Sequence, residues 1–241
     1  MPDDTIKKSH LSPALVFHTG ITAVKAEGLY VHGADGRRYM DFSSGLATVN
    51  AGHCPPEVVA AARAQMERLI HSGCIFHYAP EEELSKKLSE ITPGGIDMFF
   101  FSNSGAEAVE GAIKLARYYT GRQGIIAFTG GFHGRTFGAL SLTTSASRYR
   151  ERYHPLLPSV FHSPYPYCYR CPMGQKRETC SMDCFNYLKR ILKYQISAKE
   201  VACVVIEPVL GEGGYTVPPA EFMEKLRELC TREGILFVAD E

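Results

Sequence analysis

Polar residues follow four apolar segments of this chain, each at the point where the segment ends. The segment "FFF" gives way to residues 102–105, "SNSG", and "IIAF" is followed by "TGGFHGRT". Glu207 follows "VVI", and Asp240 follows "FVA". Open parallel sheets bind ligands outside the carboxyl ends of their strands. The four endings together predict a ligand site, although any single one would be read only as the turn that ends a strand.

The first ending has the form of an anion-binding turn that leads into a helix. Ser102, Asn103 or Ser104 can cap the helix, and Gly105 lets a ligand approach the backbone closely. The first N–H groups of a helix lack partners, so a phosphate binds readily there. The stretch has neither the P-loop pattern nor the G-x-G-x-x-G pattern, so a nucleotide is not indicated.

The two acids restrict the choice of phosphate ligand. A carboxylate at the end of a buried strand is unfavourable unless a cation or a hydrogen-bond donor meets it. Pyridoxal phosphate combines a phosphate, a protonated pyridine nitrogen for Asp240 or Glu207, and an aromatic ring. Phe132 can stack on that ring, His133 can hydrogen-bond nearby, and Arg135 offers a planar fork to a substrate carboxylate.

Strands and helices alternate in the part of the chain that carries these residues. Apolar runs at 96–103, 124–131, 201–208 and 234–241 are separated by helical patterns. Near-continuous apolar strands between helices predict an α/β fold with a mainly parallel sheet flanked by helices. The helix that follows residue 104 has an apolar stripe, which predicts that these residues are packed: Ala106, Val109, Ile113, Ala116 and Tyr119.

The first hundred residues predict smaller elements. The turn signal "GADG" predicts a hairpin or meander over 28–43. Helices are predicted over 55–70 and 81–91. The spacing in the first helix places these mostly apolar residues on one face: Val58, Ala61, Ala62, Gln65, Met66 and Leu69.

Composition excludes several classes of partner. The chain has 241 residues, is 45% hydrophobic, and balances 26 Lys and Arg against 26 Asp and Glu. This balance gives no sign of nucleic acid or of an anionic membrane as a partner. The sequence has neither a signal-peptide pattern nor an uncharged run of transmembrane length, so we expect a cytoplasmic protein.

Several motifs taken together resemble the class III aminotransferases, pyridoxal-phosphate enzymes of fold type I, and most of all their 4-aminobutyrate branch. These motifs are "DFSSGLATVNAGHCPPEVVAA", "NSGAEAVEGAIKLARYYTGR", "IIAFTGGFHGRTFGALSLT", "IEPVLGEGGY" and "GILFVADE". The resemblance implies that residues 1–54 are an N-terminal segment of the small domain. Residues 55–241 would be an incomplete large cofactor-binding domain with a cysteine-rich insert at 165–184.

The resemblance also implies roles for single residues. Gly105 and Ala106 would bind the cofactor phosphate through their N–H groups, and Phe132 would stack on the ring with His133 beside it. Asp240 would pair with the pyridine nitrogen, and Glu207 would position the surroundings of the cofactor. For the substrate, Arg135 would bind a carboxylate, and Glu212 would pair with a switching arginine. Arg135 could instead bind a backbone carbonyl, and Glu212 could be a solvated turn residue.

The implied reaction moves an amino group from an ω-amino acid such as 4-aminobutyrate to a 2-oxo acid such as 2-oxoglutarate, in a homodimer or higher oligomer. Ornithine, acetylornithine or β-alanine aminotransferases and racemases of the same family are alternatives. Relatives continue past the Asp240–Glu241 pair to a Schiff-base lysine and a C-terminal small domain, and neither Lys114 nor Lys225 matches that lysine. We therefore expect a truncated chain that is inactive alone, with a non-catalytic remnant as a further alternative.

The insert is a second departure from the family. Cys168, Cys171, Cys180 and Cys184 have a spacing that suits a Cys₄ zinc site, an iron–sulfur cluster, a disulfide, or reduced thiols packed in a loop. A metal-binding interaction module is the matching functional alternative. Similar inserts occur in relatives without implying a metal, so we expect none.

Overall fold

The computed structural model describes residues 10–241 and divides the chain into two compact units, with the boundary between Met98 and Phe99. The assignment of residues 1–54 to a small domain and 55–241 to a large one stays a prediction. All the predicted site residues belong to the second unit.

The first unit contains the predicted meander. Strands β1, β2 and β3 form an antiparallel sheet, and the turn after β2 is closed by a 3.0 Å bond from Gly36 N–H to Gly33 O. The bounds in this unit are β1 Ala23–Glu27, β2 Tyr30–Gly33, β3 Arg38–Met40, α1 Ser44–Ala47, α2 Pro56–Met66 and α3 Ala79–Ile91. Both predicted helices are confirmed as α2 and α3. No residue of α2 is buried.

The second unit contains a four-stranded parallel sheet of order β5-β4-β6-β7. Its strands are β4 Gly124–Phe128, β5 Val160–Ser163, β6 Val201–Ile206 and β7 Leu236–Ala239. Its helices are α4 Gly105–Thr120, α5 Phe137–Leu142, α6 Asp183–Tyr194 and α7 Ala220–Glu233, with short 3-10 turns η2 Ser147–Tyr149, η3 Cys168–Arg170 and η4 Ala198–Glu200. The prediction of a parallel sheet flanked by helices is confirmed.

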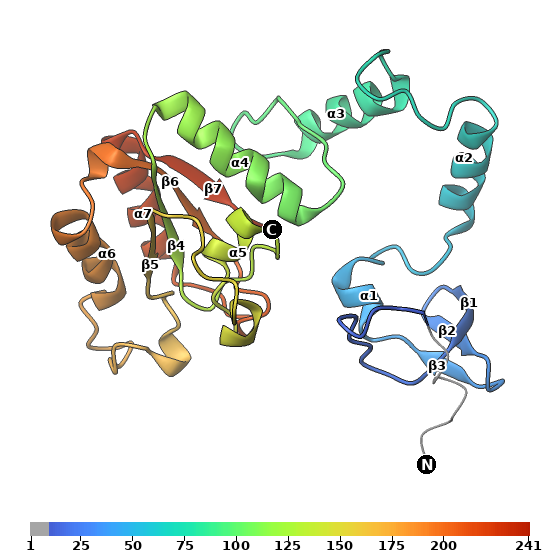
Figure 1. Ribbon diagram of the computed structural model, residues 1–241, viewed down its shortest axis with the longest axis horizontal. Helices are drawn as coiled ribbons and strands as arrows, with labels where there is room; N and C mark the ends of the chain where they lie inside the picture. Colours follow the sequence, from blue (N-terminus) through green and yellow to red (C-terminus); the bar gives the residue numbers. More distant parts are fainter. Residues whose placement is uncertain (1–9) are drawn as a thin grey trace. The chain divides into compact units, whose positions relative to one another are not determined.

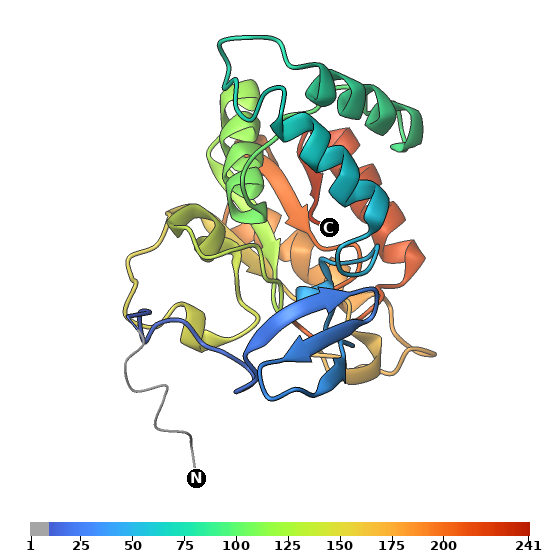
Figure 2. The same cartoon turned by 90° about the vertical axis from the view of Figure 1, so that its right-hand side faces the viewer.

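Helices cover both faces of this sheet, as Figures 1 and 2 show for α4 and α7 on opposite sides of the strands. Ile126 and Val204 pack with α6 and α7, whereas Ile125 and Val205 pack with α4 and α5. Alternate residues of each strand point to opposite faces, so both sides of β4 and β6 are buried. This double burial explains why their sequences are almost continuously apolar.

The predicted strand over 96–103 is wrong, since no strand is assigned there and Phe100 is 86% exposed. An extended segment becomes a strand only when a neighbouring strand pairs with its backbone, and none of the described strands does so. Strand β5 was missed because it is short and ends in the polar pair His162 and Ser163.

Helix α4 follows its predicted stripe except at the last position. Val109, Ile113 and Ala116 are buried, whereas Tyr119 is 76% exposed. Tyr119 lies in the final turn, just before Gly121 ends the helix in a left-handed conformation. No helix of the described residues is long and apolar enough to cross a membrane.

One strand residue makes the stability of the fold depend on pH. Burial, followed by the nearby charge of Arg150, lowers the pKa of His162 below its ordinary value of 6.5. As the pH falls, the unfolded chain therefore takes up this proton first. The stabilisation from the neutral imidazole is present above pH 6.5 and is lost as the pH falls through the lower folded-state pKa.

We predict that lowering the pH from about 8 to about 5 reduces the free energy of unfolding less in His162→Asn than in the wild type. Urea denaturation at the two pH values measures the difference. His71→Asn, which removes an exposed imidazole, is the control and should match the wild type. Equal pH dependence in the wild type and His162→Asn would contradict the assignment.

Candidate functional site

A pocket of about 230 Å³ lies at the carboxyl ends of β6 and β7. It is lined by Phe132, Glu207, Val209, Gly211, Glu212, Asp240 and Glu241. Four of the predicted site residues therefore meet in one place, although they are up to about a hundred positions apart in sequence. The lining has four acids and neither Lys nor Arg, so the pocket favours a ligand with a positively charged group.

Glu207 ties the loop after β4 to the loop after β6. Its Oε1 accepts a 2.6 Å bond from the Phe132 N–H, and its Oε2 accepts a 2.6 Å bond from the Gly211 N–H. The residue is only 8% exposed, so these two donors replace the water that a free carboxylate would bind. The buried hydroxyl of Tyr165 also donates to the Glu207 backbone oxygen, at 3.0 Å.

His133 and Asp240 form a pair. His133 Nδ1 lies 2.7 Å from Asp240 Oδ2, and because a carboxylate only accepts, the Nδ1–H donates. The His133 side chain is 1% exposed, and its backbone N–H donates to Thr143 Oγ1 at 2.9 Å. Within residues 10–241, the other oxygen of Asp240, Oδ1, makes no hydrogen bond. That oxygen is available to a donor on a ligand.

Phe132 and Glu212 are joined through Tyr149, a residue that the sequence did not single out. The rings of Phe132 and Tyr149 meet edge to face with centroids 5.3 Å apart. The Tyr149 hydroxyl donates to Glu212 Oε1 at 2.5 Å, and Ser145 Oγ donates to Glu212 Oε2 at 3.1 Å. Glu212 is therefore not merely a solvated turn residue. Tyr149 lies between two arginines in "SRYR", a pattern that gives no sign of a site.

The N-terminus of α4 has the predicted cap. Ser104 Oγ accepts from the Glu107 N–H at 3.2 Å, and Glu107 Oε2 accepts from the Asn103 N–H at 2.8 Å. In the described part of the chain, the Gly105 and Ala106 N–H groups find no acceptor, and the space beside Gly105 is open. A Cβ on Gly134 would lie 2.7 Å from the Ala106 Cβ, so this helix end touches the loop that carries His133.

Arg135 is exposed, and its guanidinium makes neither an ion pair nor a hydrogen bond with any residue from 10 to 241. In the described part of the chain, it does not bind a backbone carbonyl. Its side chain is free to meet an anion.

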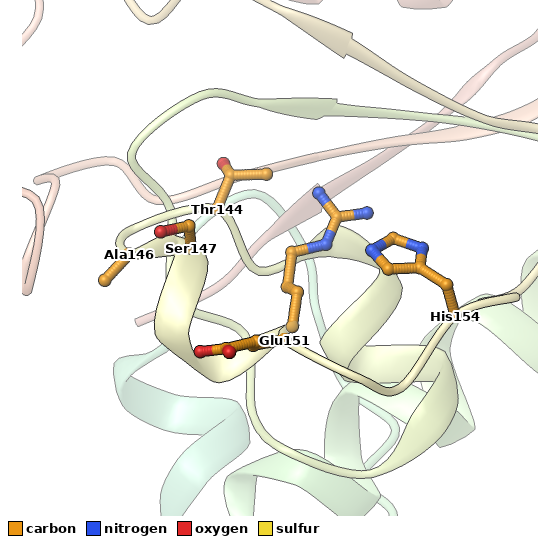
Figure 3. Close-up of a pocket in the computed structure, with 6 residues that line it drawn as sticks. Thr144, Ala146, Ser147, Glu151 and His154 are labelled. Atoms are coloured by element: carbon orange, nitrogen blue, oxygen red, sulfur yellow. The ribbon is translucent and has the colours of Figure 1, made fainter.

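A larger pocket, of about 540 Å³, lies beside the segment that follows α5 (Figure 3). It is lined by Thr144, Ala146, Ser147, Arg150, Glu151 and His154, and Figure 3 shows Thr144 and His154 on different sides of it. None of the predicted site residues lines this pocket. Its one ring-bearing side chain among the described residues is His154, whereas the pocket at the ends of β6 and β7 has Phe132.

The cysteines of the insert make no disulfide, since all eight cysteines of the chain are free. Across residues 10–241, no three His, Cys, Asp or Glu side chains are grouped so that they could hold a metal ion. Cys184 is half-buried next to the α6 and α7 core, and burial raises the pKa of its thiol to about 11. Cys184 is therefore a packed, protonated thiol at neutral pH.

The family model for class III aminotransferases matches residues 13–241. A probable 4-aminobutyrate aminotransferase of Bacillus subtilis is 42% identical over 221 residues, which cover 91% of this chain and 51% of that protein. Isoleucine 2-epimerase of Lentilactobacillus buchneri is 38% identical, with coverages of 99% and 53%. The chain thus spans about half the length of these curated relatives.

Solved structures give the same relationship. An (S)-enantioselective ω-transaminase from Thermomicrobium roseum superposes with a TM-score of 0.86 at 34% identity, covering 95% of this chain and 54% of that one. A taurine:2-oxoglutarate aminotransferase from Bifidobacterium kashiwanohense, in complex with pyridoxal phosphate and glutamate, has a TM-score of 0.81 at 32% identity. The coverages in that case are 91% and 50%.

We predict that Glu207→Ala lowers the free energy of unfolding by about 2–4 kcal/mol, because two part-buried backbone N–H groups lose their acceptor. Chemical denaturation of the full-length protein measures the change. Glu224→Ala, at an exposed position on α7, is the control and should stay within about 0.5 kcal/mol of the wild type. If the two variants are equally stable, Glu207 does not hold the two loops together.

Proposed function

The chain belongs to the class III aminotransferase family, and we propose that the protein transfers the amino group of an ω-amino acid such as 4-aminobutyrate to a 2-oxo acid such as 2-oxoglutarate. The observation that carries this proposal is the pocket lined by Phe132, Glu207 and Asp240, with His133 hydrogen-bonded to Asp240. The resemblance places a catalytic lysine beyond Glu241, and that placement stays a prediction.

The cofactor of the family is pyridoxal 5′-phosphate, and the described residues offer a group for each of its parts. The unpaired N–H groups of Gly105 and Ala106 suit the phosphate, with open space beside Gly105. Asp240 Oδ1 suits the protonated ring nitrogen, and the acidic pocket lining supports a positive charge there. The Phe132 ring lines the same pocket and suits the aromatic face.

When bound, pyridoxal phosphate supplies an electron sink for the bonds that break at the amine-bearing carbon. Asp240 would hold the proton on the ring nitrogen, which makes that sink effective. His133 donates to the opposite oxygen of the same carboxylate and so fixes its orientation. Glu207 would act indirectly, through Phe132, because it holds the backbone of that residue at the edge of the pocket.

Arg135 and Glu212 would select the substrate. A guanidinium binds a carboxylate through two parallel hydrogen bonds, and Arg135 has no other partner among the described residues. Glu212 is held in place by Tyr149 and Ser145, and would pair with the switching arginine that the resemblance implies. This pairing would occupy that arginine while an amine without an α-carboxylate is bound.

Other activities in the family remain alternatives to a 4-aminobutyrate preference. Arg135 favours a carboxylate-bearing substrate without selecting among 4-aminobutyrate, ornithine, acetylornithine and β-alanine. The similarity to an isoleucine 2-epimerase keeps a racemase in consideration. A non-catalytic remnant is the alternative from another class. Homo-oligomer formation and a cytoplasmic location stay predictions.

The test is a substrate comparison on the full-length protein supplied with pyridoxal phosphate. We expect glutamate to form from 2-oxoglutarate with 4-aminobutyrate as donor, at a higher kcat/KM than with acetylornithine, ornithine or β-alanine. Chiral analysis of isoleucine incubated without a 2-oxo acid tests epimerisation. Epimerisation without transamination, or no turnover of any of these donors, would refute the proposed function.

We predict that Arg135→Gln raises the KM for 4-aminobutyrate about 10- to 100-fold, which corresponds to losing about 1.5–3 kcal/mol from a charged hydrogen bond. Steady-state kinetics at saturating 2-oxoglutarate measure the change. Arg152→Gln removes an equally charged side chain that is 90% exposed, and it should leave the KM unchanged. An unchanged KM in Arg135→Gln would show that another group binds the carboxylate.

A further inference from the structure

Glu110, on the second turn of α4, binds the segment that directly follows Arg135. Its Oε1 accepts a 2.7 Å bond from Thr136 Oγ1, a 2.8 Å bond from the Gly138 N–H and a 3.2 Å bond from the Ala139 N–H. One carboxylate oxygen thus holds three donors from a segment of four residues. Among residues 10–241, Glu110 is the only side chain that connects α4 to the start of α5 by hydrogen bonds.

The start of α5 depends on this carboxylate. The N-cap residue of α5, Thr136, makes no capping bond with its own side chain, so Glu110 supplies the acceptor from another helix. Gly138 leaves room for it, because a Cβ at that position would overlap the Glu110 carboxylate. This role could not be predicted from the sequence, because a Glu on a partly exposed helix face is usually solvated.

A second contact, one helical turn before Glu110, also joins α4 to the loop that carries Arg135. Ala106, four residues before Glu110 and on the same face of α4, touches Gly134, as described above. Arg135 lies between the two contacts. The backbone on both sides of Arg135 is therefore fixed to the helix whose N-terminus carries the unpaired N–H groups of Gly105 and Ala106.

We propose that Glu110 is a positioning residue that sets the spacing between the anion site at the N-terminus of α4 and the guanidinium of Arg135. This inference rests on the proposed function. With a cofactor phosphate bound at the helix end and a substrate carboxylate bound by Arg135, the spacing determines which length of ω-amino acid places its amine at the reacting carbon. Glu110 thereby contributes to substrate selection without touching the substrate.

The test uses Glu110→Ala, Glu110→Gln and Gly138→Ala in the full-length protein with pyridoxal phosphate bound. Glu110→Gln keeps an amide oxygen in the place of Oε1, so it should retain the contact, whereas the other two variants remove or displace it. For Glu110→Ala and Gly138→Ala we expect the KM for 4-aminobutyrate to rise about 10- to 100-fold. The ratios of kcat/KM among β-alanine, 4-aminobutyrate and 5-aminovalerate should move toward one.

Two further measurements do not need turnover. The dissociation constant of glutarate, a dicarboxylate that cannot be transaminated, should rise in the same two variants while the cofactor absorption spectrum stays unchanged. Amide hydrogen exchange over residues 133–142 should quicken in both and stay near wild type in Glu110→Gln. Unchanged exchange in Glu110→Ala would show that Glu110 does not hold the start of α5 in place, and would refute the inference.

The outcomes separate the inference from the proposed function. Faster exchange together with unchanged KM, length ratios and glutarate binding would reduce Glu110 to a structural residue and overturn the inference. If the wild type neither transaminates an ω-amino acid nor binds glutarate, the proposed function fails, and Glu110 cannot position a substrate site. Glu110→Gln, which keeps an oxygen acceptor, is the folded reference for the other two variants.

Discussion

Two carboxylates at the ends of neighbouring parallel strands must be met by donors, and much of the second unit is arranged to provide them. Glu207, after β6, is satisfied by two backbone N–H groups from two different loops. Asp240, after β7, is met on one oxygen by the buried imidazole of His133. Because an unpaired buried charge is costly, these bonds fix the loops around the pocket. The Asp240 oxygen that remains free is then a site for a cation or a donor from outside the chain.

The loop after β4 contacts both carboxylates and also the first turn of α4. It gives a backbone N–H to Glu207, an imidazole to Asp240, and a glycine that touches the first turn of α4 at Ala106. Glu110 holds the same segment as it enters α5. The groups suited to a phosphate, a ring, a ring nitrogen and a substrate carboxylate thus belong to one connected set of contacts. A displacement in any of them would alter the geometry of the others.

Much of this arrangement follows from the sequence because it depends on local patterns. Strands β4, β6 and β7 are apolar over almost their whole length, and β4 and β6 are buried on both faces. The cap at Ser104 has its Glu107 three positions later. What the sequence did not predict depends on contacts between distant residues. Tyr149 contacts the pocket-lining residues Phe132 and Glu212, and Glu212 lies far from it in sequence. The segment around Phe100 fails as a strand because strand formation needs a neighbour, which no apolar run can guarantee on its own.

The central claim is that the pocket at the ends of β6 and β7 holds the ring of pyridoxal phosphate. A crystal structure of the full-length protein grown with that cofactor tests it most directly. The account predicts the ring against Phe132, its nitrogen within hydrogen-bonding distance of Asp240 Oδ1, and its phosphate on the N–H groups of Gly105 and Ala106. A cofactor bound elsewhere, for example in the larger pocket between Thr144 and His154, or a ring nitrogen away from Asp240, would contradict it.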